Sequence, residues 1–551
     1  MAVRGPVCVL AGAGTGKTRV ITHRIAYGVD SGLFSPNRVM AVTFTTRAAG
    51  EMRGRLRALG IEGVAARTFH AAALAQLNYF WPIVTGGEHA PALSTNKVRV
   101  LADAAQRLGI HADAATLRDV AGEIEWRKVT MRSLPQYAAA SRPGIGRLSH
   151  AQVVDLQEAY EKLKDERRQL DFEDILLVCA GMIETEPRVA RAVREQYRHF
   201  TVDEYQDVSP LQHRLLQLWL GQRDDVCVVG DASQTIYSFT GADSRYLLEF
   251  GREHPSALVV RLERSYRSVP RVLTLANTLM RGRPGALALV SGDADSAPRA
   301  GSATAERPPV TEYASDEAEA AGIARAVRAE LDAGATPAQI AVLYRSHAQS
   351  PLLQQALGDE GVATTVLGGR RFFELPEVRS ALLLLRGESI APSPLPLVPR
   401  VRALLEREGL TAAPPEAGGA LRDAWESRAA LLRLAEAAPD GTTLREFTDA
   451  LQARERDQHE PPLRTVTLST LHAAKGLEWE SVHIAGVSEG LLPISYATTL
   501  DAVDEERRLL YVGITRAARR VSLSWSAGGA RGARAASRFL NELVPPGRGL
   551  R

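Results

Sequence analysis

Residues 6–19 read PVCVLAGAGTGKTR, an apolar run followed by a glycine-rich turn and the pair Lys17-Thr18. The apolar run predicts a buried strand, and the residues from Arg19 onward predict a helix. Glycines between a strand and a helix let backbone N–H groups converge on a phosphate, and the helix adds its positive N-terminal end. In this pattern Lys17 would reach the β- and γ-phosphates of a nucleotide, and the Thr18 hydroxyl would bind Mg²⁺. Ala11 stands where the strict pattern has glycine, so a glycine-rich turn beside a chance Lys-Thr pair is the alternative.

Further apolar runs recur along the chain and alternate with helical patterns. Short buried runs separated by helices predict a parallel sheet covered by helices. Because the runs fall into two groups, one in each half of the chain, we predict an α/β fold with two such domains. The runs in the first half are Pro6–Leu10, Val39–Phe44, Phe200–Asp203, Val226–Gly230 and Leu258–Leu262, and those in the second half are Ile340–Tyr344, Thr465–Ser469, Val482–Gly486 and Val521–Trp525.

Two long stretches interrupt this alternation. Residues 95–168 carry no buried-strand pattern and predict helices, ending in an amphipathic run from Ser149 to Arg168. Residues 387–464 are rich in Ala, Pro and Arg, with closely spaced prolines from Pro392 to Pro399 that indicate a linker-like entry. We interpret both stretches as insertions into the α/β domains. Residues 291–309 are predicted to form a polar, mobile loop.

Two adjacent carboxylates, Asp203 and Glu204, follow the predicted strand that begins at Phe200. At the carboxyl end of a strand beside a phosphate loop, Asp203 would complete the Mg²⁺ shell, and Glu204 would orient and deprotonate water. An acidic loop alone is more often a solvated turn. The phosphate loop on the same predicted sheet favours the catalytic interpretation.

A second polar loop follows the predicted strand Val226–Gly230. Gln234 in this loop would sense the terminal phosphate of a nucleotide, and the aromatic side chains of Tyr237 and Phe239 would stack on bases. Aromatic residues at this spacing pack in a hydrophobic core just as often. The alternative that Tyr237 and Phe239 are core residues therefore stays open.

The composition limits the class of protein. The chain has 551 residues, a formal net charge of +3, 45% hydrophobic residues and 24% charged residues, proportions that are globular and exclude wholesale disorder. Near-neutral charge confines any nucleic-acid surface to a local track. Three well-separated cysteines exclude a disulfide scaffold and a four-cysteine metal site, and no apolar run is long enough to span a membrane. Only six of the 67 basic residues are lysines: Lys17, Lys97, Lys128, Lys162, Lys164 and Lys475.

Eight motifs in a fixed order resemble those of the UvrD/Rep/PcrA family of superfamily 1 DNA helicases. The phosphate loop resembles the family's motif I, which tolerates Ala at its first position, and Asp203–Gln206 resembles the family's Asp-Glu-x-Gln box. Asp171–Leu176 matches the segment that precedes this box in the family. The remaining segments are Val42–Ala49 (motif Ia), Thr68–His70 (Ib), Gly230–Gly241 (III), Ser265–Ser268 (IV), Leu471–Glu478 (V) and Glu506–Ala517 (VI).

The resemblance implies a fold, a reaction and partners. The fold would be two RecA-like parallel-sheet P-loop domains, each with a mainly helical insertion. The reaction would be ATP-dependent 3′–5′ DNA helicase or translocase activity, with ATP and Mg²⁺, stimulated by single-stranded DNA. Partners would be single-stranded DNA, single-strand/duplex junctions and repair or recombination proteins, with no membrane and a cytoplasmic, nucleoid-associated location. The domains would span residues 1–94 with 169–262, an insertion at 95–168, residues 263–386 with 465–551, and a shortened insertion at 387–464.

The resemblance also assigns roles to individual residues. Tyr266 would stack on adenine, Glu478 would lie near the ribose, and Arg516 would be an arginine finger supplied by the second domain. In full, it implies catalytic roles for Lys17, Glu204, Gln234, Arg267 and Arg516; nucleotide contacts from Ala11, Gly12, Ala13, Gly14, Thr15, Gly16, Lys17, Thr18, Arg19, Tyr266 and Glu478; Mg²⁺ ligation by Thr18 and Asp203; and DNA contacts from Phe44, Thr68, His70, Tyr237, Phe239 and His472.

The sequence departs from the family pattern at several points. The family's adenine-recognising Q motif would precede Met1, so either the sequence begins downstream of its natural start or adenine recognition is weakened. Thr240 stands where motif III normally has Arg, and the second insertion is shorter than in the family. The segment Gly528–Gly532 is glycine-rich and lacks an aromatic residue, where relatives carry the hairpin that separates the duplex. Two alternatives to a helicase therefore stay open: a translocase that displaces proteins with little unwinding, and a catalytically silent nucleotide-binding subunit.

Overall fold

The computed structural model describes residues 3–140, 142, 144–292, 310–367, 372–390, 395–413, 420–436, 438–456, 464–529 and 532–543. These residues form two compact units. The first unit contains the chain up to Ala11 and residues Gly16–Leu262, and the second contains Gly12–Thr15 and the chain from Glu263 onward. The predicted polar loop at 291–309 lies outside the described residues from residue 293 onward.

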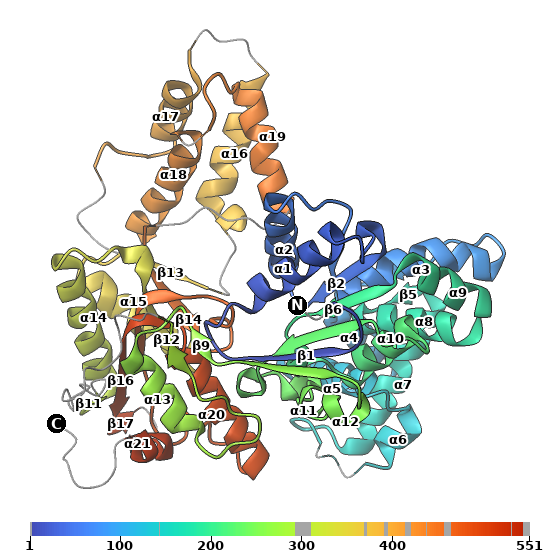
Figure 1. Ribbon diagram of the computed structural model, residues 1–551. Helices are drawn as coiled ribbons and strands as arrows, with labels where there is room; N and C mark the ends of the chain where they lie inside the picture. The colour runs from blue at the N-terminus through green and yellow to red at the C-terminus, as the bar shows by residue number, and fades with distance from the viewer. Residues whose placement is uncertain are drawn as a thin grey trace. The chain divides into compact units, whose positions relative to one another are not determined.

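A six-stranded parallel sheet forms the centre of the first unit (Figure 1). Its strands are β1 (Val7–Ala11), β2 (Val39–Thr43), β3 (Ala65–Thr68), β6 (His199–Val202), β7 (Val226–Gly230) and β8 (Leu258–Leu262), in the order β3-β2-β6-β7-β1-β8. All five predicted runs are strands, and β3 is an edge strand that the sequence analysis did not predict. The prediction that β8 is buried is wrong, because β8 forms the other edge of the sheet and Leu258 and Val259 are 48% and 46% exposed.

Alternate residues of the strands fill two hydrophobic cores on opposite faces of this sheet, because successive side chains of a strand point to opposite sides. Met40 and Val42 pack in one core and Val39 and Ala41 in the other. Strands buried on both faces appear in the sequence as continuous apolar runs. The first core is covered by α3 (Phe69–Thr85), α8 (Phe172–Thr185), α9 (Pro187–Gln196) and α10 (Pro210–Leu220), with the short α11 (Arg245–Leu248) and α12 (Phe250–Glu253), and the second by α1 (Lys17–Asp30) and α2 (Thr46–Ala58).

Four helices between residues 97 and 166 form a separate cluster in the first unit. They are α4 (Lys97–Arg107), α5 (Ala114–Val129), α6 (Leu134–Ala138) and α7 (His150–Glu166). Each is preceded by an N-cap residue whose side chain accepts a backbone hydrogen bond, and Ser149 caps α7 at the start of the predicted amphipathic run. The cluster has its own core, which includes Leu101, Ile124 and Leu156. The two-residue strands β4 (Ala92–Leu93) and β5 (Gln169–Leu170) pair where the chain enters and leaves it.

The second unit contains a second six-stranded parallel sheet. Helices α14 (Asp316–Asp332) and α15 (Ser350–Asp359) share one core with the sheet, and α13 (Pro270–Met280) packs against α20 (Leu500–Ile514) and α21 (Arg538–Leu543). All four predicted runs are strands. The strands, in spatial order, are β11 (Val310–Tyr313), β16 (Ala517–Ser526), β15 (Trp479–Ile484), β12 (Ile340–Tyr344), β14 (Val466–Thr470) and β13 (Thr364–Val366), and the short pairs are β9 (Arg264–Ser265) with β10 (Val290–Ser291) and β17 (Gly528–Gly529) with β18 (Gly532–Ala533).

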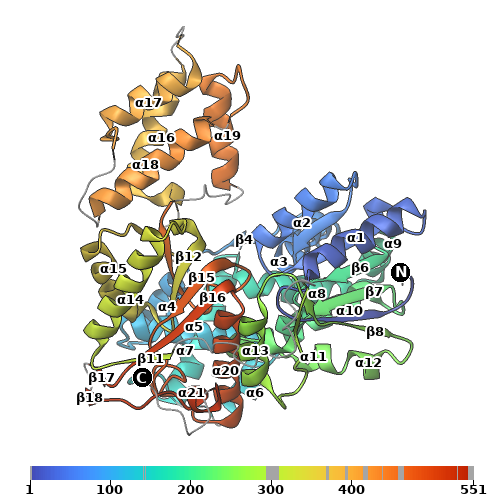
Figure 2. The same cartoon turned by 60° about the vertical axis from the view of Figure 1, so that its left-hand side comes forward.

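A second helical cluster lies within the second unit, and Figure 2 shows it in yellow and orange. It consists of α16 (Pro376–Ser389), α17 (Leu397–Arg407), α18 (Ala420–Glu436) and α19 (Leu444–Arg456). All four helices contribute to one core, so α16 packs with the insertion although the predicted boundary at residue 386 divides it. Pro399 lies in the first turn of α17, where its missing N–H breaks no helical hydrogen bond, so the expected linker is already helical there.

The observed architecture confirms the predicted fold class, two parallel-sheet domains of RecA-like type that each carry a mainly helical cluster. The exact segment boundaries stay a prediction. No helix in the described part of the chain is long and apolar enough to cross a membrane.

Candidate active site

The phosphate loop links β1 to α1. Thr15 donates its hydroxyl to the carbonyl of Gly12, with an Oγ1–O distance of 2.9 Å. Gly14 and Gly16 have φ angles of 74° and 88°, in the left-handed region that glycine adopts at no steric cost. Gly16 is the N-cap of α1, so the helix presents its unsatisfied N–H groups at the loop. Ala11 ends β1 and Ala13 is buried in the loop, whereas Arg19 is exposed in the first turn of α1.

The predicted carboxylate pair follows β6, which is separated from β1 by β7 alone. The Asp203 carboxylate accepts a hydrogen bond from the backbone N–H of Glu204, at 2.9 Å. Glu204 has a φ angle of 52°, which is uncommon for a residue with a Cβ and points to a constrained functional position. Its Oε1 lies 3.6 Å from the Lys17 ammonium. Two residues that lie far apart in the sequence, the phosphate-loop lysine and the predicted base, are therefore neighbours.

Gln206 connects this acidic loop to the next one. Its amide N–H₂ donates to Glu204 Oε2 at 2.6 Å and to Asp207 Oδ2 at 3.1 Å, and its Oε1 accepts the backbone N–H of Asp231 at 3.0 Å. The side chain is fully buried. A Cβ on Gly230 would lie 2.5 Å from Gln206 Oε1, so only glycine leaves room for this bridge.

Asp231 and Gln234 complete the group from the end of β7. Gln234 donates its side-chain amide to Asp231 Oδ2 at 2.7 Å, and Asp231 Oδ1 accepts the backbone N–H of Ser233 at 3.0 Å. Burial raises the pKa of the Asp231 carboxyl above its ordinary value, although the Lys17 charge and both hydrogen bonds oppose the shift. Asp231 therefore fixes which way the Gln234 amide points.

No role was predicted from the sequence for Gln206 or Asp231. Both lie inside motifs that resemble those of the family, and Asp231 follows β7 just as Asp203 follows the neighbouring strand β6. The carboxyl ends of adjacent parallel strands lie at one edge of a sheet, so this shared position could have indicated Asp231. A bridging glutamine has no comparable sequence signal.

The predicted residues of the second unit form their own cluster. Arg267 pairs with Glu478 at 2.6 Å and also donates to the Thr515 carbonyl at 3.3 Å. Arg516 is 2% exposed, and its guanidinium donates to the carbonyls of Val512 and Leu477 at 3.0 and 3.1 Å. Motifs IV, V and VI are thus joined through two arginines.

Tyr266 belongs to the second unit together with Gly12–Thr15, the first part of the phosphate loop. The Tyr266 backbone N–H donates to the Gly14 carbonyl at 2.8 Å, whereas the ring is 70% exposed. The ring therefore offers an open face for stacking, as the resemblance implies.

The candidate DNA-binding residues near the start of α3 lie close to one another. Thr68 is the N-cap of α3 and accepts the Ala71 N–H at 3.1 Å. His70 stacks on Phe172 with ring centroids 3.8 Å apart, and burial, followed by the charge of Lys97, lowers the pKa of His70 to about 4. Phe172 is 51% exposed and was not predicted as a DNA contact, whereas Phe44 is half-buried against the first core.

Tyr237 and Phe239 lie in the loop after Gln234. Their rings meet edge to face with centroids 6.1 Å apart, and Phe239 is 63% exposed. Burial, followed by the charges of Asp207 and Glu204, raises the pKa of Tyr237 to about 12, so its hydroxyl is electrostatically linked to the acidic loop. His472 lies in the second unit after β14, where burial and the charges of Arg345 and Lys475 lower its pKa to about 4.

Comparison with known families identifies these two units. The UvrD/REP helicase N-terminal domain matches residues 1–255, and the UvrD-like helicase C-terminal domain matches residues 260–388 and 426–528. The chain belongs to the UvrD/Rep family of helicases. This confirms the resemblance inferred from the eight motifs.

Several relatives in this family cover almost the whole chain. It is 46% identical to the ATP-dependent DNA helicase UvrD2 of Mycobacterium tuberculosis, over 99% of this chain and 80% of the relative. It is 28% identical to DNA helicase II of Escherichia coli, over 95% of this chain and 83% of the relative. It is 26% identical to the ATP-dependent DNA helicase PcrA of Bacillus subtilis, over 94% of this chain and 80% of the relative.

Proposed function

We propose that this UvrD/Rep-family chain is an ATP-dependent DNA helicase whose ATP hydrolysis is stimulated by single-stranded DNA and which moves 3′ to 5′. The observation that carries the proposal is the group of Lys17, Glu204, Gln206, Asp231 and Gln234, which are linked by contacts of 2.6–3.6 Å and follow the neighbouring strands β1, β6 and β7. A charged lysine, a candidate base and an oriented amide are the parts that phosphoryl transfer to water needs.

Lys17 and Glu204 divide the catalytic work in the first unit. Lys17 binds the β- and γ-phosphates together with the backbone N–H groups of the phosphate loop. Glu204, held by the Gln206 amide, orients a water molecule and accepts its proton. Gln234, whose amide is oriented by Asp231, contacts the terminal phosphate when it is bound. The position of Gln234 therefore couples the presence of that phosphate to Tyr237 and Phe239, which follow it in the same loop.

The residues around the loop fit a magnesium ion that is shared with the nucleotide. Thr18 offers a hydroxyl and Asp203 a buried carboxylate, and Mg²⁺ is usually held by one or two such ligands plus phosphate oxygens and water. No cluster of three or more His, Cys, Asp or Glu in the described ranges could hold a metal by itself. Bound Mg²⁺ would neutralise phosphate charge during transfer.

The second unit supplies the remaining positive charge in this proposal. Arg516 stabilises charge that develops on the γ-phosphate, Arg267 binds the same phosphate, and Tyr266 and Glu478 contact the adenosine. Repeated binding and hydrolysis of ATP would then change the grip of Phe44, Tyr237, Phe239 and His472 on a single strand. A role in DNA repair or recombination, at single-strand/duplex junctions in the cytoplasm, agrees with this activity.

The test has two parts. ATP hydrolysis is measured with and without oligothymidylate, and strand displacement is measured on duplexes with 3′ or 5′ tails. We expect DNA to stimulate hydrolysis and only the 3′-tailed duplex to be separated. Hydrolysis that is absent under all conditions would favour a silent nucleotide-binding subunit, and displacement of the 5′-tailed duplex would contradict the polarity.

A specific feature favours a second candidate, a translocase with limited unwinding. The strands β17 and β18 form an antiparallel hairpin of two residue pairs, Gly528 with Ala533 and Gly529 with Gly532. The intervening residues, Ala530 and Arg531, lie outside the described structure, and neither is aromatic. Aromatic stacking is worth about 1–3 kcal/mol per base, and this hairpin sequence supplies none. Translocation on single strands is compared with displacement of short and long 3′-tailed duplexes; efficient displacement of the long duplex would reject this candidate.

A further inference from the structure

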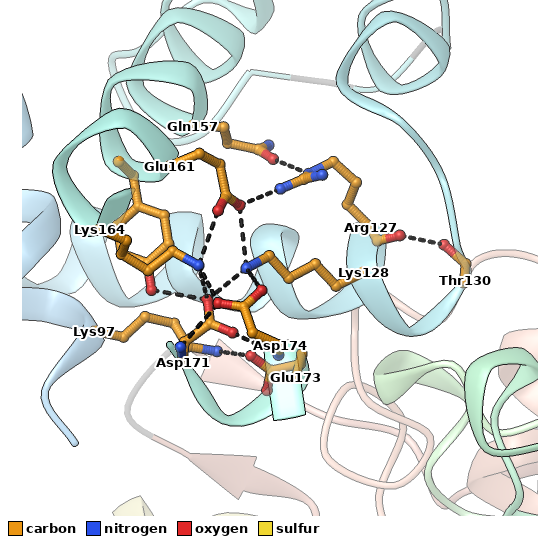
Figure 3. A network of polar contacts seen from close by, with 11 residues as sticks. Lys97, Arg127, Lys128, Thr130, Gln157, Glu161, Lys164, Asp171, Glu173 and Asp174 are labelled. Atoms are coloured by element: carbon orange, nitrogen blue, oxygen red, sulfur yellow. Dashed lines mark hydrogen bonds and ion pairs between the residues drawn. The ribbon is translucent and has the colours of Figure 1, made fainter. Parts of the chain in front are cut away.

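A buried ionic cluster joins the first helical cluster to α8 (Figure 3). Lys128 from the end of α5 contacts Asp171 and Asp174 at 2.6 Å each and Glu161 at 3.1 Å. Lys164 from α7 contacts the same three carboxylates, at 2.8 Å for Glu161 and 3.1 Å for Asp171, with Asp174 in the closest contact. We call these five residues the two-lysine cluster.

The two-lysine cluster is mostly buried and its charge is balanced. The side chains of Lys128 and Lys164 are each 3% exposed, and that of Asp171 is 1% exposed. Arg127 pairs with Glu161 at 2.5 Å, so three cations face three carboxylates. Buried charges that are paired and hydrogen-bonded in this way strongly disfavour any rearrangement that leaves one of them alone.

Both central cations of the cluster are lysines, in a chain whose basic residues are mostly arginines. Of its 67 basic residues only six are lysines, which leaves 61 arginines, yet lysine occupies both central positions of the cluster. An ammonium group directs three donors around one point and can contact three separate carboxylates, whereas a guanidinium presents its donors in a flat fork. Each lysine contacts all three carboxylates, an arrangement that an arginine could not reproduce.

Two residues that follow cluster members directly in the sequence contact candidate DNA-binding segments. Asp171 is the N-cap of α8, and the following residue is Phe172, which stacks on His70. Lys128 is followed by Val129, a buried residue that packs against Gly241, the last residue of motif III. A Cβ added at Gly241 would lie 2.6 Å from Val129 Cγ2, so the two residues are in close contact. Gly241 ends the short helix η4 (Ser238–Thr240), which contains Phe239. The two-lysine cluster thus holds the backbone next to Phe172, which contacts His70, and next to Val129, which contacts motif III.

We propose that the two-lysine cluster is a positioning site for DNA binding: it aligns the end of α5 and the start of α8, and thereby sets the affinity of the chain for single-stranded DNA, without taking part in ATP hydrolysis. Lys128 and Lys164 are its positioning residues. The proposal rests on the proposed helicase function, because it concerns the DNA track of that enzyme.

The test replaces ammonium by guanidinium in the full chain. ATP hydrolysis by Lys128→Arg and Lys164→Arg is followed against oligothymidylate concentration, with Lys162→Arg as the matched control. Lys162 lies on α7 beside the cluster but is 74% exposed. We expect the DNA concentration for half-maximal stimulation to rise about tenfold in both cluster variants, which corresponds to a loss of about 1.4 kcal/mol in binding free energy. The DNA-free rate and the rate at saturating DNA should stay within about twofold, and the control should match the parent.

Two milder variants cover the case in which the arginine variants do not fold. Tyr160→Phe removes only the hydrogen bond that the Tyr160 hydroxyl donates to Asp171 at 2.9 Å. Val129→Ala loosens the contact with Gly241 and leaves the cluster intact. Both should raise the half-maximal DNA concentration a few-fold at an unchanged DNA-free rate.

A rescue experiment separates positioning from loss of stability. Lys164→Met leaves one carboxylate without its cation, and adding Glu161→Gln restores the charge balance. The double variant should bind DNA more tightly than Lys164→Met alone. Failure of this rescue would show that the charge balance of the cluster does not set DNA affinity and would overturn the proposal.

The possible outcomes distinguish a failure of the positioning role from a failure of the helicase function. Cluster variants that behave as Lys162→Arg does, or that lose DNA-free and DNA-stimulated hydrolysis in equal proportion, would overturn the positioning role. A parent chain whose hydrolysis does not respond to DNA would overturn the helicase proposal itself, and the positioning role with it.

Discussion

Replacing Gln206 by methionine should disable the active site without touching any residue that contacts the nucleotide in the proposed mechanism. Methionine has nearly the same length and volume, so packing is retained while three hydrogen bonds are lost. Glu204 and Asp207 lose an amide donor, and the Asp231 N–H loses its acceptor. The carboxylate of Glu204 would then be held less firmly, because its side chain is 24% exposed and loses the amide that orients Oε2.

The size of the effect follows from the burial of each partner. Water can replace the lost bond at Glu204, so that loss should cost little. Asp207 is 4% exposed, and a hydrogen bond to a buried charged group is worth about 1.5–3 kcal/mol. A buried N–H left without an acceptor costs about 1–3 kcal/mol more. We therefore expect Gln206→Met to lower the free energy of unfolding of the chain by about 2.5–6 kcal/mol.

Two measurements check this expectation. Urea unfolding of the parent and the variant gives the change in stability. Steady-state ATP hydrolysis at saturating DNA should show kcat reduced about tenfold or more, because a base that is not held in place rarely meets the water it must deprotonate. The KM for ATP should change little. A stability loss below about 1 kcal/mol, or an unchanged kcat, would refute the bridging role of Gln206.

Three further outcomes are expected. Glu204→Gln should lower kcat about 10²-fold or more while ATP binding is retained, as is usual for a lost general base; turnover within threefold of the parent would exclude Glu204 as the base. Arg516→Ala should lower kcat by about 10³-fold or more, measured under single-turnover conditions, and an unchanged rate would exclude an arginine finger. Burial lowers the pKa of His70 from 6.5 to about 4 in the folded chain. As the pH falls, the unfolded chain therefore binds a proton at this residue before the folded chain does. The free energy of unfolding accordingly decreases between pH 6.5 and pH 4. Between pH 7.5 and pH 5 the parent should lose about 2 kcal/mol more unfolding free energy than His70→Gln, and equal losses would contradict this.

The fold could be predicted from the sequence because its strands are buried on both faces. Such strands are continuous apolar runs, and nine of them were recognised. The strands β3, β11 and β13 were not predicted, because they are short edge strands whose residues are partly exposed and include both polar and apolar types. Edge position is set by the tertiary arrangement of the sheet, and for the same reason β8 is more exposed than its apolar sequence suggested.

The active site could be predicted only in part. Lys17, Glu204 and Gln234 could be named as candidate site residues because their motifs have a known chemical purpose and follow predicted strands. Gln206 could not be assigned, because its role depends on two loops that meet only after the sheet has formed. The two-lysine cluster could not be predicted either, because its members come from α5, α7 and the start of α8, and the scarcity of lysine and the family segment Asp171–Leu176 do not show that they meet.

That burial of lysines has a practical consequence for handling the protein. Amine-reactive dyes and surface coatings modify accessible ammonium groups, and most of the six in this chain are shielded. The side chains of Lys17, Lys97, Lys128 and Lys164 are 13%, 18%, 3% and 3% exposed, and Lys475 is half-buried. Lys162, at 74%, is therefore the side chain that brief acylation should label first. A fluorophore or tether could be attached to this side chain, on α7, without adding or removing any cysteine.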